Sequence, residues 1–589
     1  MLSFAFANGL PAAPLPPLQM ERTMRIRILS LLPALILTLA WVGSASDLHA
    51  QERVLIAQES VVDLAELERV IAAGDLFERE QRWGEALMHY EQAVRKYPDR
   101  HELGQRLLTA RMYYDVGRRY HDESFAATVD RLEESKALEL YGEILLKIHS
   151  HYVDEPDWTQ IVRRGGRAME VALNEPSFLE HHRLTMNRSP ISSRRQINKD
   201  AEQEAATDGC LAGFTNEVRR MRTINSRHDA REMVKYFAQV GHQQLGITPA
   251  SIVLEFASAA TGTLDNYSGF LTADQLSDVM SQIEGNFVGL GVELKAEDDA
   301  LLIVNVIPGG PAERAGLGVG EHITAVEGVS TTQVSLDAAA DMLKGVEGST
   351  VRLTVQSRQG RPRELQLRRQ RVEVPSIEDS RIVDRQYGIA YMRLSSFQKT
   401  TGKDFEVALW DLHRQGMRSI IVDVRGNPGG LLSASVEVAD KFVSKGSIVR
   451  TVGRSSAENR DYRAHAVGTW RMPLIVLIDG DSASASEIFA GAIRDHRRGT
   501  LIGKRSYGKG SVQGIFPLDV TNAGVRLTTA KFYSPSGHPI ANRGVHPDII
   551  VQSTAKPVGQ HNPGGSRPGG EDAVLNAGLQ VARRQLTQR

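Results

Sequence analysis

A serine stands where a buried strand is predicted to meet a helix. Five apolar residues, Leu474 to Ile478, run into a Gly/Asp turn, and the apolar positions beyond the turn recur on one helical face. Ser484 and Glu487 have the S-x-x-E spacing of a capping box, which predicts that Ser484 is the N-cap. Its hydroxyl and the amide of Ala485 would lie at the positive end of that helix, where the hydroxyl could cap the helix or act as a nucleophile.

A short predicted strand, Thr500 to Gly503, leads to a lysine in a glycine-rich turn. Lys509 lies between Gly508 and Gly510, and glycines let a backbone turn sharply and approach other groups closely. A lysine can act as general base for a serine only when burial lowers its pKa from about 10.4 toward roughly 7 to 8. If this turn folds back into the core, Lys509 could take the proton of Ser484, and the pair could perform acyl transfer without a histidine.

The same turn also fits the start of a phosphate-binding loop. Gly503 to Lys509 reads G-x-x-x-x-G-K, but Gly510 stands where a Ser or Thr should hold magnesium. A strand-like stretch, residues 511–516, follows where that loop requires a helix. These departures argue against nucleotide binding.

Composition limits the other classes of protein. With 70 basic and 71 acidic residues, the chain has no overall charge that would indicate nucleic acid or an anionic membrane as a partner. The single cysteine, Cys210, rules out an intramolecular disulfide, and the 17 histidines form no metal-binding motif. We therefore predict no metal and no cofactor. The length of 589 residues indicates roughly three or four domains.

The first 50 residues have the pattern of an export signal. Arg25 and Arg27 precede an apolar run over residues 28–42, small residues continue through Ser46, and Met24 is a second candidate start. No later run approaches the roughly 20 apolar residues that span a bilayer. We expect an exported protein of the periplasm or cell envelope, with no integral membrane segment after signal cleavage.

Two helical regions are predicted next. Residues 51–135 contain one tetratricopeptide-like hairpin with Trp83 and Gly84 at its turn, and its pattern residues are Gly74, Phe77, Ala86, Tyr90, Ala93 and Pro98. A single unit cannot bury its own face, which favours a hairpin packed on another part of the protein over a peptide-binding array. Residues 136–276 form the second helical region, with a polar insertion at about 181–213.

The remaining chain is richer in strand patterns. Residues 277–373 read as short strands separated by Gly/Pro turns. Residues 374–552 alternate strand and helix, which indicates an α/β core, and residues 553–589 read as a Pro/Gly-rich linker with a last helix. The predicted fold class is therefore multidomain α+β.

The candidate serine and lysine resemble those of a known family. The runs 482–488 and 508–513 are similar to the serine-lysine carboxyl-terminal processing proteases, also called tail-specific proteases. In that family the base lysine follows the nucleophile by 25 residues and a glutamine follows the lysine by 4; here 509 − 484 = 25 and 513 − 509 = 4. The resemblance selects Ser484 over the two nearby serines and implies that Gln513 orients Lys509.

The resemblance also implies the rest of the site and the fold. It implies a crotonase-like core of the ClpP-type spiral, and a PDZ-like domain over residues 277–373. The turn 423–430 would offer a glycine amide, from Gly430 or else Gly429, that pairs with the amide of Ala485 in an oxyanion hole. In the PDZ-like domain a sheet edge beside a glycine-rich loop would bind a peptide terminus. The expected residues of this cradle are Gly289, Leu290, Gly291 and Val292.

These patterns together predict an exported serine endopeptidase. Its partners would be proteins or peptides with accessible C-termini, which it would cleave at or near their tails. The alternative is a secreted peptide-binding adaptor whose protease-like core is inactive. Retention of Ser484, Lys509 and Gln513 favours the enzyme, because an inactive core has no reason to keep all three. The sequence leaves the oligomeric state open.

Overall fold

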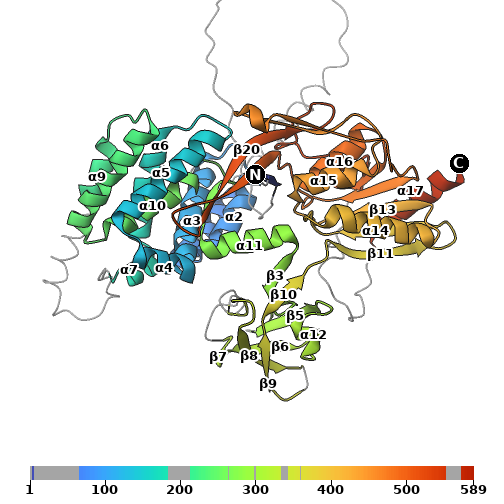
Figure 1. The fold of residues 1–589 in the computed structure, drawn as a ribbon, viewed down its shortest axis with the longest axis horizontal. Coiled ribbons are helices and arrows are strands. Elements are labelled where there is room, and N and C mark those ends of the chain that lie inside the picture. The colour runs from blue at the N-terminus through green and yellow to red at the C-terminus, as the bar shows by residue number, and fades with distance from the viewer. Residues whose placement is uncertain are drawn as a thin grey trace, which may run out of the picture. The chain divides into compact units, whose positions relative to one another are not determined.

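A computed structural model of the chain describes residues 3–5, 66–183, 213–262, 264–297, 300–332, 342–357, 360–551 and 572–588. Most of the predicted signal segment, apart from residues 3–5, Cys210 with most of the polar insertion, and most of the predicted linker lie outside these residues. The chain divides into two compact units, one of residues 10–118 and 171–180 and one of the remainder (Figure 1). None of the described helices is long and apolar enough to cross a membrane.

The smaller unit is helical. Residues 66–79 form a helix, and α2 (Trp83–Lys96) and α3 (His101–Tyr120) follow it. A Cβ on Gly74 would lie 2.3 Å from the hydroxyl oxygen of Tyr90, so these two tetratricopeptide positions are in direct contact. The predicted turn at Trp83 and Gly84 is wrong, because residues 80–82 form the turn and both residues begin α2, where Trp83 stacks on Tyr113.

The larger unit begins with helices that precede its sheets. Helix α10 is buried over most of its length, and its carboxylate Glu255 accepts hydrogen bonds from Arg119 at 2.6 Å and Tyr120 at 3.1 Å. A buried charge is thereby paired within the helical core. The bounds of these helices and of α7 are α4 (Glu123–Arg131), α5 (Glu134–His151), α6 (Trp158–Ala172), α7 (Pro176–His181), α9 (Arg227–Leu245), α10 (Pro249–Gly262) and α11 (Ala273–Glu284).

A small β region follows α11. Its main sheet has the order β4-β5-β6-β8-β9 with β7 paired to β6, and β3 pairs with β10 in a separate two-stranded sheet. Alternate residues of β8, Val351, Leu353 and Val355, are fully buried in its core. The elements are β3 (Asn286–Gly289), β4 (Val292–Glu297), β5 (Ala300–Val306), α12 (Pro311–Arg314), β6 (His322–Val326), β7 (Val329–Ser330), β8 (Thr350–Gln356), β9 (Arg363–Arg368) and β10 (Gln370–Glu373).

The C-terminal part is an α/β core. Its central sheet has the order β11-β12-β13-β17-β18-β21, in which β12 to β21 run parallel and β11 pairs antiparallel with β12. The strands and helices are β11 (Ile377–Asp384), β12 (Ile389–Leu394), α14 (Thr401–Arg414), β13 (Ser419–Asp423), α15 (Leu432–Asp440), β17 (Leu474–Ile478), α16 (Ala485–Asp495), β18 (Thr500–Gly503), β21 (Ile549–Ile550) and α17 (Ala573–Thr587).

Both faces of this parallel sheet are covered. In β17, Leu474, Val476 and Ile478 join a cluster with Ile488 and Phe489 of α16. The alternate residues Ile475 and Leu477 join a second cluster with Val574 and Ala582 of α17. A strand buried on both faces reads as a continuous apolar run, and the predicted bounds of β17 and β18 therefore agree with the structure.

A second sheet carries the segment that follows Lys509. Its order is β14-β1-β19-β20-β15-β16, with β2 also paired to β20. A strand rather than a helix follows Gly510, which removes the phosphate-loop alternative. The strands are β1 (Ser3–Ala5), β2 (Gly269–Leu271), β14 (Gly430–Leu431), β15 (Ser447–Gly453), β16 (Arg460–Arg463), β19 (Ser511–Pro517) and β20 (Gly524–Tyr533), and a short 3₁₀ helix covers Ser456–Glu458.

Candidate active site

Ser484 lies in a tight turn between β17 and α16. It is the N-cap of α16, as predicted, but its backbone has a φ of 57° and a ψ of −112°, an unfavourable conformation for a residue with a Cβ. Its buried hydroxyl has no hydrogen-bond partner among the described residues. The two nearby serines differ, because Ser482 Oγ donates to Val424 O at 2.8 Å and Ser486 Oγ to Asn427 O at 3.0 Å. The geometry thus distinguishes Ser484 from its neighbours.

The glycine-rich turn after β13 lies against Ser484. A Cβ on Gly429 would lie 2.8 Å from Ser484 Cβ and 3.0 Å from the amide nitrogen of Ala485. The amide of Gly429 donates to Asn427 Oδ1 at 2.8 Å, and the Asn427 carbonyl accepts from Ala483 N at 3.0 Å. Asn427 is fully buried and so ties the glycine turn to the nucleophile turn.

Gly430 occupies a position that only glycine can take. Its φ is 138°, and a Cβ there would lie 2.1 Å from the carbonyl oxygen of Phe397. The backbone of Phe397 holds the turn from both sides, since its N–H donates to Gly429 O at 2.9 Å and its carbonyl accepts from Leu431 N at 2.7 Å. The two glycines predicted for an oxyanion hole are therefore fixed beside Ser484 and Ala485.

Lys509 is buried, with an exposed fraction of 1%. Burial lowers the pKa of its amine well below the ordinary value; the charge of Arg526 lowers it further, and Asp265 and Glu487 act in the opposite direction. The ammonium nitrogen lies 4.8 Å from the centroid of the Tyr267 ring. Lys509 forms no ion pair within the described part of the chain, so its environment favours the neutral amine.

Gln513 lies on β19, four residues after Lys509. Its Nε2 donates to Ser511 Oγ at 2.9 Å and more weakly to Thr528 Oγ1 at 3.4 Å. Its Oε1 is buried and has no hydrogen-bond partner among the residues described. No hydrogen bond joins Gln513 to Lys509 in this part of the structure, and Oε1 is left as a vacant acceptor.

A buried ionic cluster braces the turn that carries the glycines. Arg425 donates to both carboxylate oxygens of Asp423, at 2.6 Å in the shortest contact. It also binds both oxygens of Asp572, the N-cap of α17, at 2.9 Å each. Tyr391 donates to Asp423 at 2.8 Å. Asp423 and Arg425 thus brace the turn and tie it to the C-terminal helix.

The predicted peptide cradle is the turn between β3 and β4. The carbonyl oxygens of Leu290 and Gly291 accept hydrogen bonds from Ala312 N at 2.8 Å and Ile307 N at 2.9 Å. Gly291 has a φ of 79° and lies against the backbone of Gly310. The N–H groups of Leu290 and Gly291 donate no backbone hydrogen bond within the described residues, so both amides of the loop can bind a ligand.

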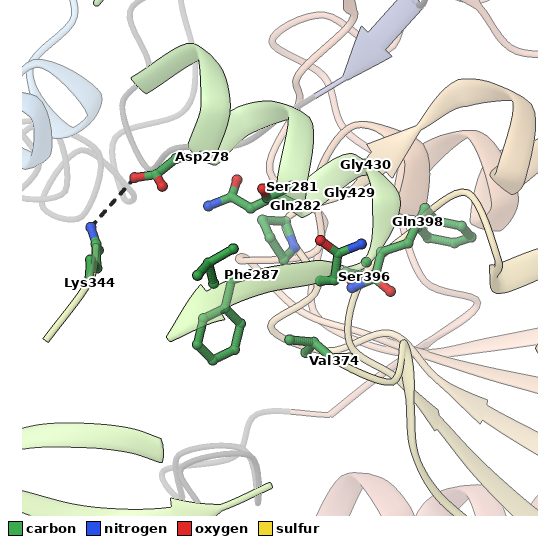
Figure 2. Close-up of a pocket in the computed structure, with 15 residues that line it drawn as sticks. Asp278, Ser281, Gln282, Phe287, Lys344, Val374, Ser396, Gln398, Gly429 and Gly430 are labelled. Atoms are coloured by element: carbon green, nitrogen blue, oxygen red, sulfur yellow. Dashed lines mark ion pairs between the residues drawn. The ribbon is translucent and has the colours of Figure 1, made fainter. Parts of the chain in front are cut away.

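A pocket of about 460 Å³ opens beside the glycine turn. Figure 2 shows Phe287 of β3, Val374 and Gln398 among the residues around it, together with Gly429, Gly430 and the Lys344–Asp278 ion pair of 3.5 Å. Gln398 brings a buried Oε1 that has no partner among the described residues. The pocket therefore offers apolar surface and one free hydrogen-bond acceptor beside the glycine turn.

Gly429 thus lies against Ser484 and the amide of Ala485, and the backbone N–H groups of Ser484 and Lys509 both donate to one carboxylate oxygen of Glu487. The family model "Peptidase family S41" matches residues 388–551, and the PDZ domain model matches residues 280–356. The chain is 35% identical over 341 residues to a carboxy-terminal-processing protease of Bartonella bacilliformis, covering 56% of this chain and 77% of that protein. It is also 35% identical over 296 residues to a carboxyl-terminal-processing protease of Synechocystis, covering 49% of this chain and 69% of that protein.

The chain belongs to the carboxyl-terminal-processing proteases of peptidase family S41, and it is a serine peptidase with a PDZ domain. Among solved structures it is similar to the photosystem II D1 C-terminal processing protease, with 23% identity and a TM-score of 0.36, over 70% of this chain and 92% of that one. The predicted family and fold class are therefore confirmed, and the inactive adaptor is not supported.

Sequence reasoning did not predict how two residues, Glu487 and Asn427, hold the site together. The capping-box pattern singled out Glu487, but it accounts for only one of the four hydrogen bonds that this residue accepts. Asn427 gave no signal beyond its place in a glycine-rich turn, and its bonds to residue 483 and to Ser486 span more than 50 positions. Single-sequence patterns report short-range order and do not report such contacts.

Proposed function

We propose that this protein is an exported endopeptidase that cleaves polypeptides near their C-terminal tails, with Ser484 as nucleophile and Lys509 as general base. The observation that supports the assignment is an unbonded, buried serine hydroxyl on a turn that Glu487 ties to the turn of a buried lysine, whose pKa is lowered by desolvation. Within the described residues, Ser484 Oγ has no hydrogen-bond partner and Lys509 forms no ion pair.

In the proposed reaction, Ser484 Oγ attacks the carbonyl carbon of the scissile peptide bond while its proton passes to the neutral Nζ of Lys509. The tetrahedral intermediate collapses, the C–N bond breaks, and Lys509 returns that proton to the leaving amine. Water then attacks the acyl-enzyme with Lys509 again as base, and the carboxylic acid product and free Ser484 are released.

The developing oxyanion would be held by the amides of Ala485 and Gly430. The amide of Gly429 donates to Asn427, which makes Gly430 the better second donor of the two glycines. Each such preorganised donor contributes about 3 kcal/mol to transition-state stabilisation. The vacant Oε1 of Gln513 is available to accept a hydrogen bond from Lys509 once substrate arrives.

The substrate would be recognised at two places. The amides of the turn at Leu290 and Gly291 would hold its terminal carboxylate. The pocket beside Gly429 would take an uncharged side chain close to the scissile bond. This division predicts selectivity both for a free terminus and for the residue at the cleavage point.

Two substitutions test the catalytic assignment. Ser484→Ala and Lys509→Arg should both abolish cleavage of an unfolded protein while leaving the circular dichroism spectrum unchanged. Arginine keeps the positive charge but cannot accept a proton near neutrality. Lys504→Arg, at an exposed lysine five residues earlier, is the matched control and should keep full activity. Substantial cleavage by Lys509→Arg would refute the Ser-Lys assignment.

Substrate recognition has a separate test. Peptides that differ only in a free or an amidated C-terminus should differ in Michaelis constant with the intact enzyme. Equal turnover of both would remove the carboxylate-binding role from Leu290 and Gly291.

Export can be checked on protein from the cell envelope. N-terminal sequencing should find a first residue between about 43 and 51, because the charged, apolar and small-residue order before that point is typical of a cleaved signal. An intact Arg25 in the mature protein would contradict export by this route.

A further inference from the structure

Glu487 joins the two catalytic turns through one carboxylate. Its Oε2 accepts hydrogen bonds from the backbone N–H of Ser484 at 2.7 Å and of Lys509 at 2.9 Å. Its Oε1 accepts from the backbone N–H of Gly508 at 2.7 Å and from Ser506 Oγ at 2.6 Å. The residue is fully buried, so these four bonds form its whole polar environment among the described residues.

Helix capping does not explain this arrangement. A capping box needs only the bond to the N-cap amide of Ser484. The other three donors come from residues 506–509, which lie 19 to 22 positions further along the chain. A carboxylate offers about four acceptor positions, and here all four are used to hold the base turn against the nucleophile turn.

The ionised form of Glu487 fits this environment. Burial raises the pKa of Glu487 to about 7, while its bonds from Ser506, Ser484, Gly508 and Lys509 lower it. Three of the four partners are backbone N–H groups, which can only donate, and the fourth, Ser506 Oγ, donates to Glu487 while it accepts from Val545 N at 2.6 Å. A proton on the carboxyl group would therefore cost a bond from a backbone N–H or reverse the bond to Ser506.

The same charge acts on the base. The groups that face the amine of Lys509 are Arg526, Asp265, Glu487 and the ring of Tyr267. Arg526 favours the neutral amine, whereas the two carboxylates favour the ammonium. Glu487 is thus the one ionised neighbour that both holds the backbone of Lys509 and opposes its deprotonation, within the described residues.

We propose that Glu487 is a positioning residue that fixes the distance between the nucleophile turn and the base turn and whose charge raises the lower pH limit of catalysis. The inference rests on the proposed roles of Ser484 and Lys509. It predicts that geometry and pH dependence can be separated by two substitutions at one position.

Glu487→Gln removes the charge, and its amide nitrogen must face at least one backbone N–H in either orientation, that of Gly508 or those of Ser484 and Lys509. A displacement of about 1 Å at a catalytic group costs on the order of 10²-fold in rate, so kcat should fall by about that factor. The neutral form of Lys509 is the active one, so kcat/KM rises with pH through its pKa. Loss of a neighbouring negative charge lowers that pKa and should move the acid limb of the profile to lower pH.

Glu487→Asp keeps the charge but is one methylene too short to reach both turns. We expect a lower kcat with the acid limb unmoved. Asp495→Asn is the matched control, because Asp495 lies at the other end of α16 and binds Ser536 N at 3.0 Å, far along the helix from Ser484. It should change thermal stability alone.

The measurements are kcat and kcat/KM against pH for a peptide substrate, with thermal unfolding as the check on folding. Wild-type kcat in Glu487→Gln, or an unmoved acid limb, would overturn the proposal. If Glu487→Gln does not fold, Glu487→Asp decides, and wild-type kcat in that variant overturns it. Residual activity in Ser484→Ala or Lys509→Arg would instead mark failure of the underlying mechanism.

Discussion

An alanine at position 429 would place a methyl group between the nucleophile and a proposed oxyanion donor. Its Cβ would lie 2.8 Å from Ser484 Cβ, 2.8 Å from the Ala483 carbonyl oxygen and 3.0 Å from Ala485 N. Ordinary carbon contacts need about 3.5 to 4.0 Å. Because all three neighbours belong to the tightly packed start of α16, the nucleophile turn must move.

The size of the effect follows from that shortfall of roughly 0.7 Å or more. A misplacement near 1 Å costs on the order of 10²-fold, and loss of an oxyanion donor costs about 10² to 10³-fold. We therefore expect Gly429→Ala to lower kcat/KM by about 10² to 10³-fold, or roughly 3 to 4 kcal/mol in the transition state. The positive φ of 108° adds backbone strain of about 1–2 kcal/mol to the free energy of folding.

A second glycine in the same turn separates strain from misplacement. Gly426 has a φ of 68°, but a Cβ there would meet only the end of the Arg393 side chain, at 3.8 Å. Gly426→Ala should therefore lower the free energy of unfolding by about 1–2 kcal/mol through backbone strain, while its kcat/KM stays close to that of the wild type.

The assay is cleavage of a quenched peptide, with thermal unfolding measured in parallel on both variants. A large loss of kcat/KM in Gly429→Ala beside a small one in Gly426→Ala, at similar stability, supports the geometry. If Gly429→Ala keeps more than about a tenth of the wild-type activity, or if both variants lose activity equally, the placement of this turn against Ser484 is refuted.

Three further outcomes are expected. Lys509→Met should abolish cleavage yet raise the melting temperature at pH 7, because burial lowers the pKa of Lys509. Each unit of lowering costs about 1.4 kcal/mol of folding free energy; the full cost is present below the folded-state pKa and declines to zero as pH rises to the unfolded value of about 10.4. Asp572→Asn should lower the free energy of unfolding by about 1–3 kcal/mol, because the bond from Arg425 outweighs burial and lowers the pKa of Asp572. This stabilisation is present above about pH 4 and is lost as pH falls through the folded-state pKa, which urea unfolding across pH would measure. Gly74→Ala should destabilise the smaller unit by about 1–3 kcal/mol, because its Cβ would overlap the Tyr90 ring, while kcat in the folded protein is unchanged.

The elements that deliver the site could be read from the sequence. Strands β17 and β18 have the predicted bounds, and α16 begins directly after Ser484. These segments carry strong local signals, namely continuous apolar runs and a small-residue turn before an amphipathic helix. Helix α16 ends at Asp495 with Arg494 in its last turn, as the basic residues at 494 and 496–498 predict.

The local chemistry of Ser484 was harder to predict. The pattern S-x-x-E indicated a hydroxyl that caps its helix, yet that hydroxyl has no partner among the described residues and Glu487 receives the amide instead. The backbone of Ser484 also differs from the extended conformation usual at an N-cap, because its φ is positive. Such a conformation persists only because contacts from distant segments impose it, here from Asn427 and residues 506–509.

The burial of Lys509 is likewise a product of segments far from it in sequence. A Cβ on Gly510 would lie 2.3 Å from Ala541 N, so the base turn reaches its depth only because glycine permits close backbone contact there. The amine then faces Tyr267 from the segment between α10 and β2, and Arg526 from β20. Arg526 also donates to the Tyr267 carbonyl at 2.8 Å, which fixes the two relative to each other. The segment between α10 and β2 therefore helps to bury Lys509 and lower its pKa. A protease core truncated at the start of β11 would expose Lys509 to water and restore its positive charge.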